Sequence, residues 1–162
     1  RLENMNFSIK FTLRKTSSIF VNNHDVMSKL FLPKIDLSVS KFSSISSIRK
    51  FLVTKQRLLT KNKNIIMIGR DIGTVVVPNA KFKFYLNASS YVRAKRRYDQ
   101  TKTKYKSIEE IKKSIDLRDK IDSTRKDSPL IPAKDAMIID TDNLSLLEVV
   151  DKMYNVFTGE NL

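Results

Sequence analysis

The chain has 162 residues, 41% of them hydrophobic, which is typical of a globular protein with a buried core. It has no cysteine and one histidine, which excludes disulfides, thiolate zinc sites, cysteine nucleophiles and Ser-His-Asp triads. The formal net charge is +14, most of it in residues 1–65, and no apolar run is long enough to cross a membrane.

Residues 1–60 are predicted to form a small antiparallel sheet followed by helices. Residues 6–12 and 18–21 alternate or run apolar around a turn, which predicts a β-hairpin. Residues 34–61 show a helical pattern that breaks once, near 43–44. His24 falls in a further predicted turn, and we expect it to be a surface residue because no other ligating side chain lies near it.

Residues 61–162 are predicted to be of the α/β class. Strands are predicted over residues 65–68, 82–86 and 137–139. Helices are predicted over residues 90–98 and after two capping boxes, 107–110 and 145–148. The order strand, helix, helix, strand, helix predicts a parallel sheet with helices packed on it.

Arg70 and Asp71 follow the predicted strand 65–68 directly, after Gly69, which allows the backbone to turn. The carboxyl ends of strands in an open α/β sheet are where ligands bind. A guanidinium group there can bind phosphate, and a carboxylate can accept a hydrogen bond from the same ligand. The alternative is an Arg–Asp pair that only holds the loop together.

Two further groups of charged residues lie on predicted helices. Arg118, Asp122 and Arg125 are spaced i, i+4 and i+7, so they share one helical face. The helix after strand 82–86 carries a basic cluster formed by Arg93, Arg96 and Arg97. Binding of a concentrated anion would offset the repulsion within such a cluster. For both groups the alternative is a solvated face whose ion pairs contribute little.

Four motifs occur in a fixed order along the chain. They are Gly69-Arg70-Asp71-Ile72-Gly73-Thr74-Val75-Val76, Arg93-Ala94-x-Arg96-Arg97-Tyr98, Arg118-Asp119-x-x-Asp122-Ser123-x-Arg125 with Pro129-Leu130, and Asp135-Ala136-x-x-Ile139-Asp140-Thr141. Together they resemble the bacterial type of cytidylate kinase (CMP/dCMP kinase). Residues 35–41 and the pair Ile48-Arg49 match that family less tightly, and residues 1–32 resemble its small sheet-bearing insert.

The resemblance implies an α/β fold of the P-loop NTPase type found in nucleoside monophosphate kinases. It would comprise an incomplete parallel sheet with flanking helices and a small antiparallel insert near the N-terminus. Residues 1–60 would be the monophosphate-binding insert. Residues 61–162 would be the core, with a short lid at about 93–106.

The resemblance also implies transfer of the γ-phosphoryl group of ATP to CMP or dCMP, assisted by Mg²⁺. Residues expected at the cytosine are Ser40, Arg49 and Asp71. Residues expected at the monophosphate, as the catalytic pair, are Arg70 and Arg125, with Arg118 and Asp122 toward the sugar. Residues expected to close over the triphosphate are Arg93, Arg96 and Arg97. Such chemistry needs positioning and positive charge rather than a nucleophilic side chain, and no metal ligands are expected in this chain.

The sequence departs from the family in several respects: the glycine-rich ATP loop and the acceptor-side motif that follows it are absent, the lid is slightly short, and Ile121 stands where a charged residue is common. Only three glycines occur, and no Gly-x-x-x-x-Gly-Lys-Ser/Thr phosphate loop can be written. Because residue 1 is arginine, we expect a C-terminal portion of the enzyme, inactive alone. We expect a monomer in the cytoplasm, with no membrane or specific nucleic-acid partner. The alternatives are a basic RNA-binding module, motivated by the charge of +14, and a nucleotide-binding remnant without catalysis.

Overall fold

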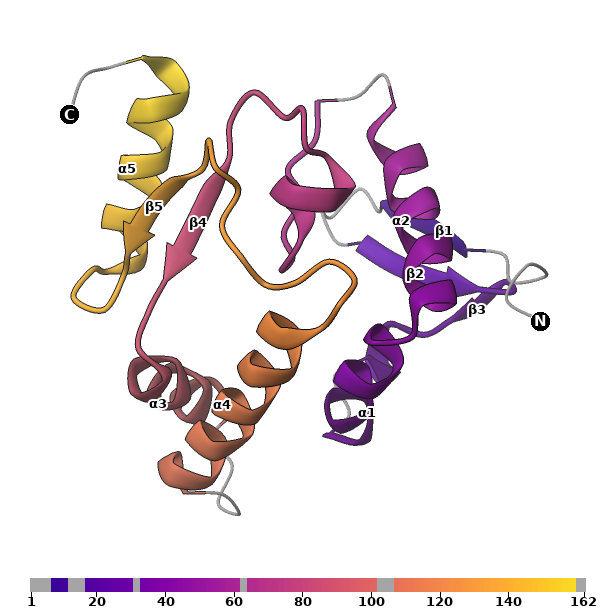
Figure 1. The fold of residues 1–162 in the computed structure, drawn as a ribbon, viewed down its shortest axis with the longest axis horizontal. Coiled ribbons are helices and arrows are strands. Elements are labelled where there is room, and N and C mark those ends of the chain that lie inside the picture. Colours follow the sequence, from indigo (N-terminus) through magenta and orange to yellow (C-terminus); the bar gives the residue numbers. More distant parts are fainter. Residues whose placement is uncertain (1–6, 12–16, 31–32, 62–63, 102–106, 160–162) are drawn as a thin grey trace. The chain divides into compact units, whose positions relative to one another are not determined.

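The computed structural model describes residues 7–11, 17–30, 33–61, 64–101 and 107–159 (Figure 1). The chain divides into two compact units, Arg1–Lys55 and Gln56–Leu162. The assignment of residues 1–60 as a monophosphate-binding insert and of residues 61–162 as the core remains a prediction.

The first unit contains a three-stranded antiparallel sheet in the order β1-β2-β3. Its strands are β1 Phe7–Phe11, β2 Ser17–Val21 and β3 His24–Asp25. The predicted hairpin is therefore confirmed, although residues 12–16 of its turn lie outside the described residues. Asn22 and Asn23 link β2 to β3 with φ values of 48° and 65°, a left-handed turn that asparagine tolerates well. His24 is exposed, as predicted.

Two helices and a short 3-10 turn complete the first part of the chain. The turn is η2 Met27–Lys29, and the helices are α1 Pro33–Ser43 and α2 Ser46–Thr60. They confirm the helical pattern and its single break. At that break the Ser44 hydroxyl donates a hydrogen bond to the Lys41 carbonyl, which satisfies one of the free carbonyls at the end of α1.

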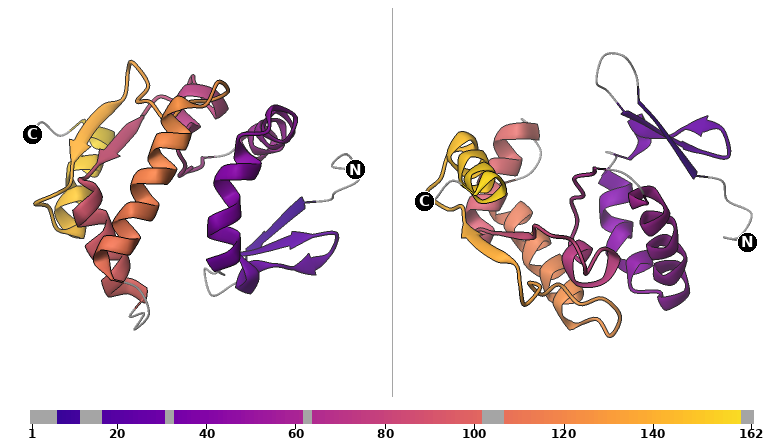
Figure 2. Two further views of the ribbon diagram at one scale, coloured as in Figure 1. Left: turned by 60° about the horizontal axis from the view of Figure 1, so that its bottom comes forward. Right: turned by 90° about the horizontal axis from the view of Figure 1, so that it is seen from above.

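The second unit is built on a two-stranded parallel sheet, β4 Phe84–Asn87 and β5 Met137–Asp140 (Figure 1). Parallel strands need a crossover connection, and two helices provide it: α3 Ser90–Thr101 and α4 Ile108–Thr124. These helices pack side by side (Figure 2). The strands predicted at 82–86 and 137–139 are confirmed with small shifts, and α3 runs three residues past its predicted end.

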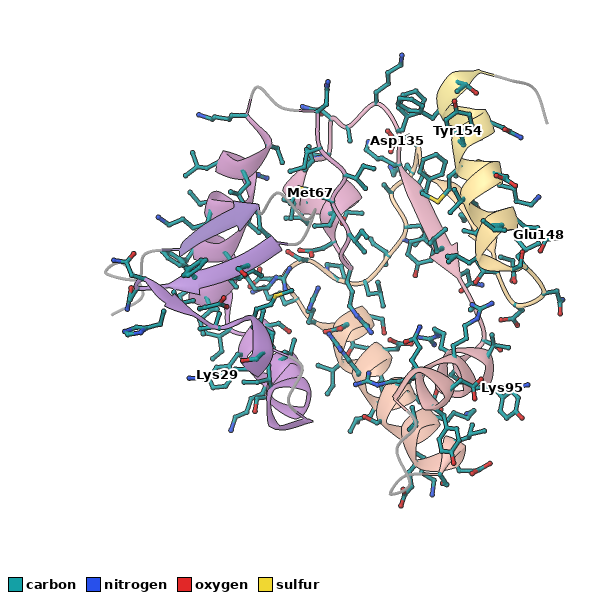
Figure 3. The ribbon with its side chains drawn as sticks, turned by 180° about the vertical axis from the view of Figure 1, so that it is seen from behind. Lys29, Met67, Lys95, Asp135, Glu148 and Tyr154 are labelled. Atoms are coloured by element: carbon teal, nitrogen blue, oxygen red, sulfur yellow. The ribbon has the colours of Figure 1, made fainter. Side chains whose placement is uncertain are left out.

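The last helix, α5 Leu146–Thr158, packs beside the sheet. Both predicted capping boxes are present, at Ser107 before α4 and at Ser145 before α5. Phe82 and Phe157 join α5 to the segment before β4, with ring centroids 5.1 Å apart. Glu148 and Tyr154 project from α5 (Figure 3), and Tyr154 is 58% exposed. The buried apolar residues of this unit are Val76, Ala94, Ile111, Ile139 and Val149.

The predicted strand over residues 65–68 is wrong. Residues 64–68 have no regular secondary structure, and Ile66 and Ile68 are 90% and 96% exposed. A strand needs a neighbour that accepts and donates its backbone hydrogen bonds. Within the described residues the parallel sheet contains only β4 and β5, so the apolar run has no strand to pair with.

Among the described residues, no helix is both long enough and apolar enough to cross a membrane.

The capping box of α4 is expected to contribute measurably to the stability of the second unit. The Glu110 N–H donates to the Ser107 hydroxyl at 3.2 Å, and the Ser107 N–H donates to Glu110 Oε2 at 3.2 Å. We predict that Ser107→Ala lowers the free energy of unfolding in urea by about 1 kcal/mol. The matched control is Ser114→Ala, an exposed position within α4, which should have no such cost because alanine favours helices. Equal values for the two variants would contradict a stabilising cap.

Candidate functional site

The centre of the candidate site is the carboxylate of Asp122 on α4, whose residue is 2% exposed. Asp122 Oδ1 lies 2.9 Å from Arg125 Nη1, and Oδ2 lies 2.8 Å from Arg70 Nη1. Arg118 Nε is 3.8 Å from the same Oδ2 atom. One buried carboxylate therefore holds three guanidinium groups, and the predicted shared face of Arg118, Asp122 and Arg125 is present.

The end of α4 fixes Arg125. The helix ends at Thr124, and Arg125 is its C-cap residue, with extended φ and ψ of −66° and 145°. Arg125 Nε donates to the Ser128 carbonyl at 2.6 Å, while the Leu130 N–H donates to the Asp122 carbonyl at 2.8 Å. Ser128 has a left-handed φ of 54°, so the chain turns sharply here. The loop after α4 is thus hydrogen-bonded to both residues of this ion pair, to the side chain of Arg125 and to the backbone carbonyl of Asp122.

Arg70 reaches the cluster from the segment before η3 Ile72–Val76, a single turn of π-helix. The carbonyl of Asp71 accepts hydrogen bonds from the N–H groups of Val75 and Val76, at 2.9 and 3.2 Å. Arg57 closes the other end of this turn, donating to the Val75 and Val76 carbonyls at 2.6 and 3.1 Å. Single π-turns often mark functional sites. Asp71 is 9% exposed, so this turn fixes both Arg70 and a buried carboxylate beside it.

Asp119 is a member of the cluster that reasoning from the sequence did not assign to the site. Its Oδ1 lies 2.7 Å from Arg70 Nη1, and its Oδ2 lies 2.6 Å from Arg93 Nη1. Arg93 also donates through Nε to the Ala88 carbonyl at 3.1 Å. The available signal was its spacing: Asp119 precedes Asp122 by three residues and therefore shares its helical face.

The other predicted site residues lie elsewhere. Arg96 donates to Thr141 Oγ1 at 3.0 Å and to the Thr141 carbonyl, so it holds the loop after β5 rather than joining Arg93. Arg97 is exposed on α3. Ser40 and Arg49 belong to the first unit, where Arg49 Nη1 donates to the Ser43 carbonyl at 3.3 Å. The side chain of Ser40, and residues 102–106 of the predicted lid, lie outside the described part.

The arrangement suits an anionic ligand. The solvated-face alternative does not hold for residues 118, 122 and 125, because the carboxylate at their centre is buried. Within the described residues, Arg118 Nε is buried and has no hydrogen-bond acceptor. A buried donor without a partner is costly, and a ligand oxygen would satisfy it. Four guanidinium groups around two carboxylates also leave N–H groups for a phosphate.

No group of three His, Cys, Asp or Glu side chains that could hold a metal ion occurs among the described residues. The carboxylates closest to the arginines, Asp119 and Asp122, each already bind two guanidinium groups within 3 Å. With these carboxylates engaged, the cluster presents guanidinium N–H groups, which suit an anion better than a cation.

Asp116 joins α3 and α4 outside this cluster. Its Oδ2 lies 2.8 Å from Lys112 Nζ. Hydrogen bonds from Lys112 and Ser90 hold the pKa of the Asp116 carboxyl below its usual range. Asp116 therefore connects the same two helices as Asp119 without an ion pair to Arg70 or Arg93.

The chain is similar to known proteins over most of its length. A family model described as cytidylate kinase matches residues 1–159. A cytidylate kinase of Clostridium botulinum (strain Okra / Type B1) is 44% identical over 142 residues, which are 86% of this chain and 65% of that protein. A cytidylate kinase of Caldanaerobacter subterraneus subsp. tengcongensis is 45% identical over 138 residues, 84% of this chain and 62% of that protein. The chain thus spans somewhat less than two thirds of these relatives.

We predict that Asp122→Asn destabilises the second unit strongly. Removing one partner of a buried ion pair leaves the other charge without compensation, at a cost of about 3 kcal/mol or more. The free energy of unfolding measured in urea checks this. The control is Asp116→Asn, which makes the same change in an exposed i, i+4 pair of α4 and should alter stability little. A loss no larger than that of the control would show that Asp122 does not organise the cluster.

Proposed function

The chain belongs to the cytidylate kinase family, and we propose that its arginine cluster is the acceptor-phosphate site of a CMP/dCMP kinase. In this reaction the γ-phosphoryl group of ATP passes to CMP or dCMP and gives the nucleoside diphosphate. ATP supplies the transferred group when it is bound, and family members of this kind use it with Mg²⁺. We propose the P-loop fold of nucleoside monophosphate kinases for the protein, which the parallel pair β4–β5 with its crossover helices supports.

The observation that carries the proposal is the fixed pair Arg70 and Arg125 on Asp122. Both guanidinium groups are anchored through Nη1 at 2.8 and 2.9 Å, so their planes are held before a ligand arrives. The side chain of Arg70 is 28% exposed and can present its other N–H groups to a phosphate. Phosphoryl transfer needs mainly such positioning, and positive charge against the transferred group.

The remaining roles follow the family resemblance. Arg118, with its buried unsatisfied Nε, is proposed on the sugar side of the nucleotide. Asp122 has both oxygens engaged by arginines, so we propose that it acts by orienting Arg70 and Arg125. Asp71, Ser40 and Arg49 are proposed to recognise the cytosine, which offers an amino donor and ring acceptors. Arg93, Arg96 and Arg97 are proposed to serve the triphosphate side, with Arg96 acting through the loop after β5.

We predict that CMP stabilises the protein more than AMP or UMP does. A ligand that binds only the folded state at 100 times its Kd adds about 2.7 kcal/mol, which is a shift of several degrees in Tm. Thermal unfolding with each nucleotide at equal concentration measures this. Arg70→Met should abolish the CMP effect, whereas Lys120→Met, which removes an exposed positive charge from α4, should preserve it.

Two outcomes would contradict this proposal. Equal shifts with all three nucleotides would remove the assignment to cytosine nucleotides. Equal shifts accompanied by RNA binding that weakens steeply with salt would instead support the basic RNA-binding module.

We also predict that the 162-residue chain alone shows no measurable kinase activity. The sequence contains no Gly-x-x-x-x-Gly-Lys-Ser/Thr motif, whose backbone N–H groups and lysine hold the β- and γ-phosphates of ATP. An assay that couples ADP formation to NADH oxidation, with CMP and Mg-ATP, measures this. The full-length cytidylate kinase of Clostridium botulinum serves as the positive control. CMP-dependent turnover by the chain alone would show that it binds ATP by other means.

A further inference from the structure

Asp119 connects two arginines that come from different elements of the second unit. Arg70 precedes η3, and Arg93 lies in the first turn of α3. The two oxygens of Asp119 take one guanidinium group each, at 2.7 and 2.6 Å. Without a carboxylate between them, two guanidinium groups this close to one residue would repel each other.

The contacts of Asp119 leave a defined edge of each guanidinium group for other partners. Arg70 is held through Nη1 alone, by Asp119 and Asp122 together. Arg93 is held through Nη1 by Asp119 and through Nε by the Ala88 carbonyl. Their side chains are 28% and 35% exposed, so solvent and ligands reach both. Two acceptors on each guanidinium group restrict its orientation and leave Nη2 to donate.

We propose that Asp119 is a positioning residue. It holds the guanidinium groups of Arg70 and Arg93 at a fixed separation and orientation, so that together they bind phosphate groups. It acts through the arginines and does not touch the nucleotide. The inference rests on the proposed function, in which Arg70 serves the acceptor phosphate and Arg93 the triphosphate side. Because side chains that are ordered beforehand lose less freedom on binding, this arrangement raises affinity. It also sets the separation between the two phosphate-binding arginines.

The direction in which one substitution changes CMP affinity distinguishes a positioning role of Asp119 from competition between its charge and the ligand. Asp119→Asn keeps the shape of the side chain and removes its negative charge. If Asp119 only competed with the ligand for the arginines, this variant would bind CMP more tightly. If it positions Arg70, CMP binding should weaken about tenfold, which corresponds to about 1.4 kcal/mol.

Titration calorimetry with CMP on the 162-residue chain provides the measurement. Asp119→Glu keeps the charge and should restore affinity to within about threefold. Asp116→Asn is the matched control, since Asp116 also links α4 to α3 and makes no ion pair with Arg70 or Arg93, its electrostatic interaction with Arg93 being minor, so it should change CMP affinity far less than Asp119→Asn does. Unchanged or tighter binding by Asp119→Asn overturns the proposal, and so does equal weakening by the control.

Arginine Nη–Hη signals in NMR spectra recorded at low temperature provide a second readout that needs no nucleotide, because Asp119 contacts both arginines through Nη1. In the unsubstituted chain, the Arg70 and Arg93 signals, assigned from Arg70→Lys and Arg93→Lys spectra, should be dispersed and slow to exchange. In Asp119→Asn, with cooperative unfolding verified, both should move toward the position of free arginine. Signals of free arginine in the unsubstituted chain overturn the proposal even where a variant fails to fold. Absence of CMP binding by the unsubstituted chain would instead count against the proposed function, and these spectra would still decide the role of Asp119.

Discussion

The second unit depends on one constraint, which is that the carboxylate of Asp122 is buried and must be neutralised. An isolated ionised carboxylate in the protein interior is costly, so its charge demands close partners. These partners are Arg70, which precedes Asp122 in the sequence and lies 2.8 Å from it, and Arg125, which follows Asp122 and lies 2.9 Å from it. The segment before η3 and the loop after α4 are thereby drawn to one point on the helix. The location of the site thus follows from the need to compensate one charge.

The same constraint explains how several arginines can gather on one surface. Guanidinium groups are always charged, and a group of them without carboxylates would push the elements that carry them apart. Asp119 and Asp122, three residues apart on α4, stand between these groups. A helix presents such a pair on one face at no cost in backbone geometry. What remains is a modest positive excess with oriented N–H groups, which suits a phosphate better than a loose basic patch does.

Local sequence signals predicted much of this arrangement. The capping boxes at Ser107 and Ser145, and the spacing of Arg118, Asp122 and Arg125, each depend on residues within two turns of a helix, and the structure has all of them. Strand 65–68 failed because an apolar run shows only that a segment can pair, while its partner is a matter of tertiary structure. For a similar reason, the sequence did not predict the π-turn at η3 or the contact of Asp119 with Arg93. They are set by Arg57 and by the packing of α3 on α4, which sequence spacing does not reveal.

The arginine cluster also lies apart from the apolar surface of the parallel sheet β4–β5. Residues 138 and 86 on β5 and β4 are more than half exposed, as are Leu146 and Leu147 at the start of α5, so this sheet buries only part of its apolar surface. The arginine cluster instead rests on α4, on the loop that follows it, and on the turn closed by Arg57. Several hydrogen bonds and ion pairs to carbonyl and carboxylate oxygens together fix the positions of its arginines. Such a cluster can keep its arrangement where hydrophobic packing is sparse, because hydrogen bonds and ion pairs are directional, whereas the hydrophobic effect is not.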